Sequence, residues 1–436
     1  LSSVTHLIHF PGTEAAMGTE LSRLPLTSLH FPEPSPSRNE LFFEDTPFQH
    51  PAFILYSSGT TGKPKCILHS HGGSLIQLVK EHQYHVDLRA NERLFFFTTC
   101  GWMMWNWLVS SLAIQAKIVL FEGNPFYPGP ERIWKMAEQE KLYLLGTSAK
   151  FIDASRKAGI YPAKIANLTE LKVICSTGSP LNVEGFDFIY EHVKSNVQLA
   201  SISGGTDIVS CFVLGCPTRP VYAGEIQCRG LGMDVVILSE QGISLKGEQG
   251  ELCCKSAFPS MPIGFWNDPD GSKYYSAYFE MFDNVWRHGD WATLSENDGI
   301  IIHGRSDATL NPGGVRIGTA EIYRPVESFN EIIEALVIGQ NINDDVRIIL
   351  FVRLKDGIIL DDELKNRLKK EIKAKATPRH VPEVIIAVED IPRTRSGKIT
   401  ELAVRDVIHN KDVKNTEALA NPEALALFKN LPELVI

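Results

Sequence analysis

Short apolar runs alternate with amphipathic segments along most of the chain. Between residues 53 and 302, the runs rich in β-branched and aromatic residues are AFILYSS, LFFFTT, KIVLFEG, LKVICS and VQLASIS, and the helical patterns include ERIWKMAEQE and GFDFIYEHVK. Strands that alternate with helices favour a largely parallel, covered sheet. We therefore predict an α/β fold for this part of the chain.

The pattern changes after residue 306 to that of a smaller α+β domain. RIILFVRL and EVIIAVED are typical of strands, and the segment between them places Leu364, Leu368 and Ile372 on one stripe of a predicted helix. The sequence predicts four parts: an irregular lead-in at 1–51, taken as the remnant of a truncated N-terminal region, a large domain at 52–306, a small C-terminal domain at 307–410 and a tail at 411–436.

Composition and charge narrow the classes of partner. The 436 residues carry a formal net charge of -9 without a long run of Lys or Arg, so nucleic acid is not an expected partner. The stretch from Leu94 to Ala116 has no charged side chain, but its Thr, Gly, Asn and Ser residues favour a buried strand, a turn and a helix over a membrane span. Eight cysteines without a CxxC pair, and the absence of a signal-peptide pattern, favour reduced thiols and the cytosol, and the oligomeric state stays open.

The segment from Tyr56 to Lys65, YSSGTTGKPK, has the composition of a phosphate-binding loop. Two glycines, four hydroxyl residues and two lysines supply free backbone amides, hydroxyl donors and ammonium groups, all of which favour oxyanions. A Walker loop is excluded because Pro64 stands where GxxxxGK requires Ser or Thr. Similar small-residue loops, TGSPL and GGTD, follow two other predicted strands, and ligands gather at the carboxyl ends of such strands. We expect the three loops to form one site.

Six blocks of the chain carry a resemblance to a known family. They are SSGTTGKPK (57–65), STGSPL (176–181), GGTD (204–207), WRHGD (286–290), GRSDATLNPGGVRIGTAEI (304–322) and PRTRSGKI (392–399). In this order they resemble the adenylate-forming superfamily, which comprises acyl-CoA synthetases, luciferases and adenylation domains of peptide synthetases. The resemblance implies a large N-terminal domain with layered, mostly parallel sheets and helices, and a small, mobile α+β C-terminal domain.

The resemblance also implies how ATP is bound. The implied ATP- and AMP-binding residues are Ser57, Ser58, Gly59, Thr60, Thr61, Gly62, Lys65, Thr177, Gly178, Ser179, Pro180, Gly205, Thr206, Asp290, Arg305 and Arg316. Among them, Lys65 would contact the β- and γ-phosphates, Thr206 the α-phosphate and Asp290 the ribose hydroxyls. Asp207 would help to hold Mg²⁺, at a position where the family usually has Glu. Taken alone, Asp290 is equally typical of a turn.

Three further residues receive roles from the resemblance. Lys398 would bridge the substrate carboxylate and the α-phosphate as a catalytic residue, together with Thr206, because a fixed cation offsets the repulsion between two anions. Asp307 would be the hinge of the small domain, and Gly314 would let the backbone approach the pantetheine arm of coenzyme A. Without the resemblance, Lys398 has the sequence context of a solvated surface lysine.

The acyl substrate is predicted from two segments. Acetate-activating members have a tryptophan two positions before the Thr-acid pair, where this chain has Gly204, so we expect room for a longer acid. GWMMWNW, SISGGTDI and FWND resemble the acetoacetate-activating branch, and Trp102 becomes a candidate pocket wall, although such clusters are also typical of a core. We predict an acid-thiol ligase for acetoacetate, ATP and coenzyme A. The alternatives are another short-chain acyl-CoA synthetase, for acetate or propionate, or a truncated, inactive nucleotide-binding isoform.

Overall fold

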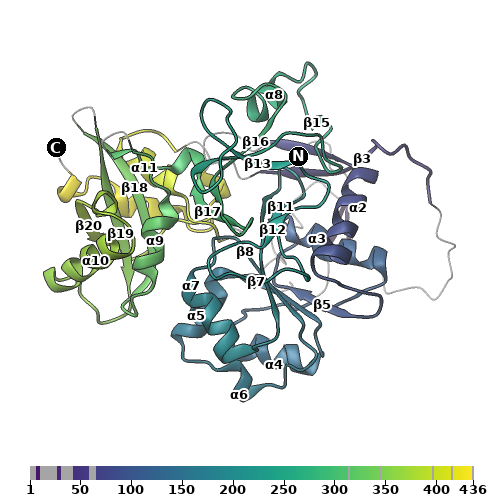
Figure 1. The fold of residues 1–436 in the computed structure, drawn as a ribbon, viewed down its shortest axis with the longest axis horizontal. Helices are drawn as coiled ribbons and strands as arrows, with labels where there is room; N and C mark the ends of the chain where they lie inside the picture. Colours follow the sequence, from purple (N-terminus) through teal and green to yellow (C-terminus); the bar gives the residue numbers. More distant parts are fainter. Residues whose placement is uncertain are drawn as a thin grey trace. The chain divides into compact units, whose positions relative to one another are not determined.

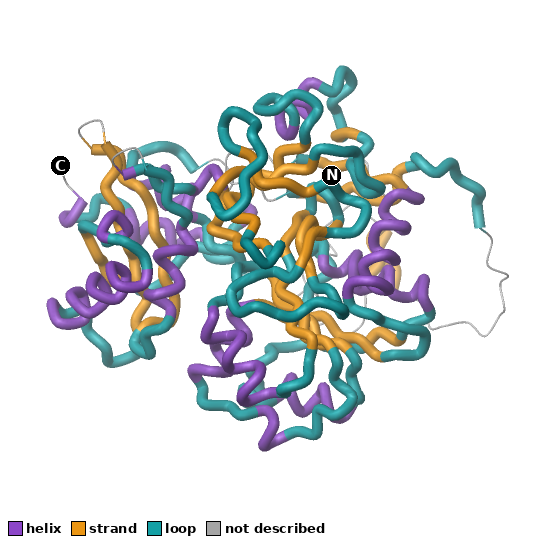
Figure 2. The backbone as a smooth tube through the Cα atoms, in the orientation of Figure 1, coloured by secondary structure: helices purple, strands orange, loops and turns teal. Residues whose placement is uncertain are grey.

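A computed structural model describes residues 6–9, 27–30, 43–57, 65–312, 315–342, 345–394, 397–413 and 416–434. The chain divides into two compact units, residues 1–46 and 47–436. In the first unit, β1 (His6–His9) and β2 (Thr27–His30) form a parallel pair. Every other element described below belongs to the second unit (Figures 1 and 2).

A five-stranded, wholly parallel sheet confirms the predicted alternation of strands and helices. Its strand order is β6 (Lys117–Ile118), β5 (Arg93–Phe96), β7 (Leu144–Ser148), β8 (Val173–Thr177), β9 (Gln198–Ser201). One face is covered by α4 (Arg132–Gln139), α5 (Ala149–Lys157), α6 (Pro162–Ile165) and α7 (Val183–Phe188) (Figure 1). The other face packs against α2 (His71–Lys80), the π-helix η2 (Glu81–His85) and α3 (Met104–Ser110). Both faces of the sheet are therefore buried.

The stretch without charges from Leu94 to Ala116 forms the predicted strand, turn and helix. It supplies most of β5, then α3, then the 3₁₀-helix η3 (Ser111–Ile114). Among the residues that the structure describes, no helix is long and apolar enough to cross a membrane.

Three further sheets of the second unit are antiparallel, so the predicted parallel pairing is limited to one of its large sheets. Their strand orders are β15 (Gly264–Phe265), β4 (Cys66–Ser70), β3 (Pro51–Tyr56); then β10 (Ser203–Gly205), β11 (Ser210–Leu214), β12 (Cys228–Arg229); then β13 (Val235–Leu238), β14 (Gln249–Cys254), β16 (Trp286–Leu294), β17 (Ile300–Arg305). Short connections join β3 to β4, β10 to β11, β13 to β14 and β16 to β17, and they allow only antiparallel neighbours, because a parallel crossover needs a dozen or more residues. The pairs β4–β15, β11–β12 and β14–β16 are joined by longer segments. Helix α8 (Ser272–Tyr278) lies between β15 and β16 in the sequence.

The C-terminal part has the predicted α+β pattern. Its sheet has the order β18 (Ile332–Ile342), β19 (Asp345–Leu354), β20 (Val384–Ala387), and its helices are α9 (Thr319–Glu327), α10 (Asp362–Lys375) and α11 (Glu401–Ile408). The remaining short helices are η4 (Ile189–Val193), η5 (Ser306–Ala308), η7 (Pro378–His380), η8 (Thr416–Ala418), η9 (Pro422–Phe428) and η10 (Pro432–Leu434).

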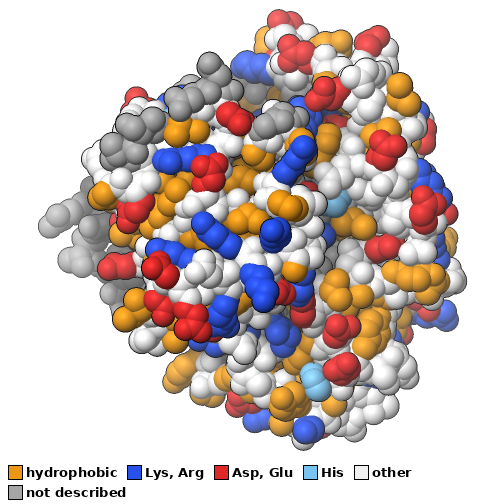
Figure 3. Space-filling model, turned by 60° about the vertical axis from the view of Figure 1, so that its left-hand side comes forward, with side chains coloured by type: hydrophobic (Ala, Val, Ile, Leu, Met, Phe, Trp, Pro, Cys, Tyr) orange, Lys and Arg blue, Asp and Glu red, His pale blue; other side chains and the backbone are white. Residues whose placement is uncertain are grey.

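Figure 3 shows basic and acidic side chains interspersed on the face of the molecule that it presents. The domain boundaries at 51, 306 and 410 stay predictions.

Helix α10 confirms the stripe read from the sequence. Leu364, Leu368 and Ile372 are buried in one apolar cluster with strands β18 and β19. The carboxylate of Asp361 accepts a hydrogen bond from the backbone N–H of Leu364 at 2.8 Å and caps the helix N-terminus. The helix therefore forms because it has both an apolar face and a start signal.

We expect Leu368→Ala to lower the free energy of unfolding of the chain by about 2–5 kcal/mol, because it leaves a cavity under α10. The change is measured by urea denaturation. The matched control is Asn366→Ala, at an exposed position of the same helix, which should stay within about 0.5 kcal/mol. Equal effects of the two substitutions would contradict the packing described for this helix.

Candidate functional site

The turn between β10 and β11 presents Thr206 and Asp207. The two strands pair antiparallel, with Gly205 opposite Ser210 and Gly204 opposite Cys211. Between them Val209 has a φ of 47°, a left-handed conformation that a β-branched residue rarely adopts. Such strain persists only where the surrounding structure enforces it, and it gathers at functional sites.

Asp207 is held by two donors from distant segments. Lys65 Nζ donates to Asp207 Oδ1 at 2.9 Å, and the Tyr278 hydroxyl donates to the same oxygen at 2.5 Å. Burial acts to raise the pKa of the Asp207 carboxyl, but the charge of Lys65 and the hydrogen bonds from Tyr278 and Lys65 hold it well below its usual range. Asp207 is therefore a carboxylate at neutral pH.

Tyr278 was not among the predicted site residues. It ends α8 and stacks on Trp286 with ring centroids 3.7 Å apart, while the Lys65 ammonium lies 4.7 Å from the centroid of the tyrosine ring. Its neighbours Tyr274 and Tyr275 have the same residue type, so no local pattern distinguishes it. Only the contact with Asp207 identifies it.

His69 on β4 supports the same turn from another side, and it too was missed. It is buried, and its Nε2 lies 3.0 Å from the carbonyl oxygen of Thr206. Burial lowers the pKa of the His69 imidazole to about 4, against the raising effect of this hydrogen bond. The neutral ring must donate from Nε2, since a carbonyl oxygen only accepts. An inward-facing histidine on a strand was the available sequence signal.

Asp290 and Arg305 face each other across β16 and β17. Arg305 Nη1 donates to Asp290 Oδ1 at 3.0 Å and to the carbonyl oxygen of His288 at 3.2 Å. Burial acts to lower the pKa of Arg305, but Asp290, Asp307 and Asp207 raise it above its usual value. Asp307, the predicted hinge, lies in η5 with Oδ1 3.8 Å from Arg305 Nε. The two predicted ribose-side residues are thus paired.

Lys398 lies in a tight turn of the C-terminal part. Its carbonyl oxygen accepts from the N–H of Thr394 at 2.8 Å, and its own N–H donates to Thr394 Oγ1 at 3.1 Å. The side chain is exposed to solvent, yet the surrounding protein and the charge of Arg305 lower the pKa of its ammonium, while the carboxylates of Asp290 and Asp207 oppose this. The predicted bridge from Lys398 to the substrate carboxylate and the α-phosphate stays a prediction.

Two of the three predicted loops meet at the carboxyl edge of the parallel sheet. β8 and β9 are neighbours, and Thr177 Oγ1 donates to the carbonyl oxygen of Ile202 at 3.0 Å. Gly178 follows with a φ of 90°, which a glycine adopts without strain, and precedes Ser179 and Pro180. The third loop starts from β3, which belongs to a different, antiparallel sheet.

The third loop is joined to the site at its base. Ser57 N–H donates to the carbonyl oxygen of Lys65 at 3.2 Å, which closes the two ends of the loop, and Lys65 reaches Asp207. Five of the predicted ATP-binding residues, and one predicted coenzyme A contact, lie outside the described residues: Ser58, Gly59, Thr60, Thr61 and Gly62, and Gly314. The roles of these six residues stay predictions.

The structure changes the argument for the acyl pocket. A Cβ at Gly204 would lie 2.1 Å from the carbonyl oxygen of Ser210 and 2.5 Å from the Cα of Cys211, so the glycine faces the β11 backbone and not open space. The prediction that Gly204 leaves room for a longer acid because it lacks a side chain is therefore wrong for this backbone. Trp102 is half-buried and packs edge-on against Phe96, with centroids 6.2 Å apart.

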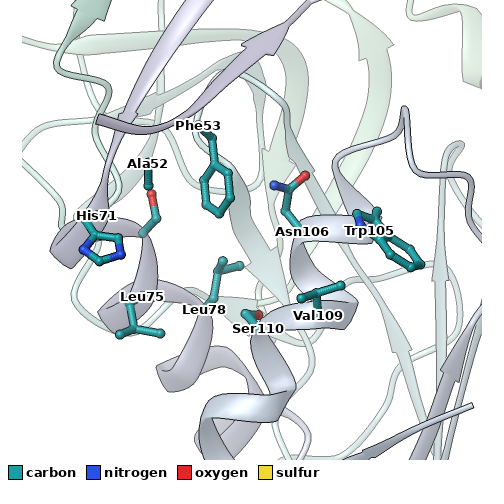
Figure 4. A pocket seen from close by; sticks show the side chains of 10 residues that line it. Ala52, Phe53, His71, Leu75, Leu78, Trp105, Asn106, Val109 and Ser110 are labelled. Carbon is teal, nitrogen blue, oxygen red and sulfur yellow. The ribbon is translucent and has the colours of Figure 1, made fainter. Parts of the chain in front are cut away.

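A cavity of about 220 Å³ lies between β3, α2 and α3 (Figure 4). Apolar side chains dominate its wall, among them Phe53, Leu78 and Val109, with Trp105 and Asn106 from α3. None of the predicted site residues that the structure describes lines it. The helix that follows Trp102 therefore contributes to this cavity through other residues.

The contacts that the structure describes for Arg316 are with residues outside the predicted site. Its Nη2 lies 3.0 Å from Glu240 Oε1, and its guanidinium lies 5.0 Å from the Trp291 ring centroid. Its predicted contact with nucleotide stays a prediction.

The donor set fits magnesium held jointly with phosphate oxygens. No cluster of three or more His, Cys, Asp or Glu that could hold a metal occurs within the described ranges. Mg²⁺ is commonly bound by one or two carboxylates plus substrate phosphates, and Asp207 is an ionised carboxylate beside Lys65 of the phosphate loop. The residues present can hold the ion only with the help of a phosphate ligand.

Comparisons with known proteins agree with this geometry. The model of the AMP-binding enzyme family matches residues 19–263, and that of the AMP-binding enzyme C-terminal domain matches residues 326–398. The chain is 61% identical over 394 residues to an acetoacetyl-coenzyme A synthetase of Rhizobium meliloti, covering 90% of the chain and 61% of that protein. It is 46% identical over 397 residues to acetoacetyl-CoA synthetase of Gallus gallus, covering 91% of the chain and 60% of that protein.

Solved structures give the same result for the fold. An acetoacetyl-CoA synthetase from Streptomyces lividans has a TM-score of 0.90 and 41% identity, over 98% of this chain and 65% of that one. An anthranilate CoA ligase in complex with anthranoyl-AMP has a TM-score of 0.76 at 19% identity, over 92% of this chain and 77% of that one, which shows a shared fold alone. The predicted adenylate-forming fold is confirmed.

The family follows from these matches, although the chain spans about 60% of the length of the curated relatives that it matches. The residues matched by the first family model are more than half of the chain. This chain belongs to the AMP-binding enzyme family.

Proposed function

We propose that this chain carries the nucleotide- and acyl-binding machinery for ATP-dependent ligation of acetoacetate to coenzyme A. The geometry that supports the adenylating half of the proposal is the contact of Lys65 Nζ, at the end of the phosphate-loop motif, with Asp207 Oδ1 at 2.9 Å, next to Thr206 in the turn between β10 and β11. The acyl substrate is inferred from the relatives, which bear the name acetoacetyl-CoA synthetase. A cytosolic location belongs to the same proposal.

In the first half-reaction, a carboxylate oxygen of acetoacetate attacks the α-phosphorus of ATP. A new O–P bond forms, the bond to the β-phosphate oxygen breaks, and pyrophosphate leaves with its electron pair. Both reactants are anions, so the Lys398 ammonium would offset their repulsion and stabilise the charge that develops at the α-phosphate. Thr206, at the tip of a turn held by His69, would donate to that phosphate.

Asp207 and Asp290 orient the nucleotide in this scheme. Asp207 would help to hold Mg²⁺, which would supply positive charge to offset the charge of the leaving pyrophosphate. Lys65, which contacts Asp207, is placed to share this work with the phosphate loop. Asp290 accepts from Arg305 through Oδ1, and the remaining lone pairs of the carboxylate are suited to ribose hydroxyls.

In the second half-reaction, the thiol sulfur of coenzyme A attacks the acyl carbon of the adenylate. A C–S bond forms, the C–O bond to AMP breaks, and the thiol proton is released to solvent. Because Lys398 serves only the first step, the C-terminal part is expected to swing about Asp307 between the steps. Arg405 Nη1, which lies 3.4 Å from the Asp307 carbonyl oxygen, would have to release this contact.

Acyl preference is tested by pyrophosphate exchange. We expect purified protein to exchange labelled pyrophosphate into ATP much faster with acetoacetate than with acetate, because the bound acid must supply the attacking carboxylate in the correct position. Propionate is the control for acid length without the keto group. Equal rates for the three acids, or a preference for acetate, would contradict the proposed substrate.

The role of Lys398 is tested by separating the half-reactions. Lys398→Ala should slow pyrophosphate exchange by about 10²–10³-fold, the usual loss when one preorganised charge-stabilising group is removed. The same variant should still convert synthetic acetoacetyl-adenylate and coenzyme A to the thioester at nearly the original rate. Lys370→Ala, at an exposed position of α10, is the matched control and should change neither rate. Pyrophosphate exchange at the original rate in Lys398→Ala would contradict the proposed role of Lys398.

A further inference from the structure

Glu81 is a buried carboxylate on which four donors converge. It opens the π-helix η2 and is 1% exposed. Its Oε2 accepts from Trp107 Nε1 at 3.0 Å, and its Oε1 accepts from Cys211 N at 3.2 Å, Gln77 Nε2 at 3.2 Å and the Ser210 hydroxyl. No predicted role was attached to this residue.

The first link of Glu81 is to the strand that carries the site. Ser210 and Cys211 are the residues opposite Gly205 and Gly204, so the carboxylate holds β11 directly beside the turn that presents Thr206 and Asp207. Gln77 reinforces this hold, since its Nε2 also donates to Ser210 Oγ at 2.8 Å. The strained residue Val209 immediately precedes Ser210.

Strain at Val209 requires an anchor on its C-terminal side. A β-branched side chain at positive φ is strained, and the turn would relax if its ends were free. On the N-terminal side the pairing of Gly205 with Ser210 and of Gly204 with Cys211 holds β10. On the C-terminal side the bonds of Glu81 to Ser210 and Cys211 hold β11.

The second link of Glu81 is to α3. Trp107 lies one turn into this helix and packs against Phe96 of the parallel sheet and against the buried ring of His82, at centroid distances of 5.8 and 4.1 Å. One carboxylate therefore joins α3 to the turn that presents Thr206 and Asp207.

A contribution to folding stability does not by itself explain why an acidic side chain is buried at position 81. Replacing buried ionic groups by packed apolar residues is often neutral or stabilising, so such groups are weak sources of folding free energy. Local π-helical geometry is also frequent at functional sites. A buried acceptor that organises donors from three segments is better suited to fixing geometry.

We propose that Glu81 is a positioning residue that holds the turn bearing Thr206 and Asp207 and couples it to α3. The expected effect of Glu81 on catalysis rests on the proposed function. The other part of the proposal, the structural half, is that Glu81 holds the turn in place, and this can be tested without substrate.

The structural half is tested by hydrogen–deuterium exchange. Glu81→Gln keeps the shape but turns an NH₂ group toward donors, so at least one of the four donors loses its acceptor. We expect amide exchange in the 203–211 segment to accelerate by about tenfold or more, while the β7 and β8 segments keep their rates. Ser210→Ala, which removes one donor and leaves the carboxylate intact, should accelerate the same segment if Glu81→Gln is too unstable to purify.

Tyr143→Phe is the matched control, since it removes a partly buried hydroxyl that lies 3.0 Å from the Asp87 carbonyl oxygen at the opposite ends of the parallel strands. Unchanged exchange at 203–211 in both test variants, or acceleration spread evenly over the chain as for a general loss of stability, would overturn the positioning role.

The catalytic half is tested on the same variants by comparing the two half-reactions. We expect pyrophosphate exchange to fall by about tenfold or more in Glu81→Gln, in the range found for residues that orient a ligand, with little change in thioester formation from synthetic adenylate. Equal losses in both half-reactions, or none, would overturn the assignment. If the unsubstituted protein showed no pyrophosphate exchange, the proposed function would fail, while the deuterium data would still decide the positioning role.

Discussion

A carboxylate that is taken out of water must be compensated, and this constraint organises the region described above. Asp207 is compensated by Lys65, Asp290 by Arg305, and Glu81 by a set of neutral donors. Leaving any of these groups unpaired in the interior would cost several kcal/mol. Each pairing therefore fixes how two segments that are distant in sequence meet, and the resulting positions are more exact than apolar packing alone would give.

Apolar packing supplies the frame on which these pairings act. The parallel sheet is buried on both faces by two separate clusters, one beneath α4 to α7 and one beneath α2 and α3. A third cluster fills the antiparallel sheets around Trp286. The polar turns project where these bodies meet, which is the usual place for ligands because loops there are supported from several sides. The frame can thus stay rigid while the turns carry strain.

Features encoded over a few residues were predictable, and features that depend on distant contacts were not. The stripe of α10 and the strands β8, β9 and β19 follow from local periodicity, so their identity needs no knowledge of the partner. The motifs that contain Asp207, Asp290 and Lys398 are local as well. Tyr278 and His69 matter through contacts with residues 71 and 137 positions away, and their immediate neighbours carry no sign of this. The same reason explains why the pairing of the short antiparallel strands was missed.

Gly204 shows why residue volume alone is a poor guide to the shape of a binding site. Its missing side chain would point into the backbone of β11, so the glycine permits close approach of two strands and does not open a void. A tryptophan at this position would force β10 away from Ser210 and Cys211, which are the residues that Glu81 holds. A change at residue 204 therefore alters the turn that presents Thr206 and Asp207. The close pairing of β10 with β11 therefore requires a glycine at position 204, and the same pairing fixes the geometry of the turn with Thr206 and Asp207.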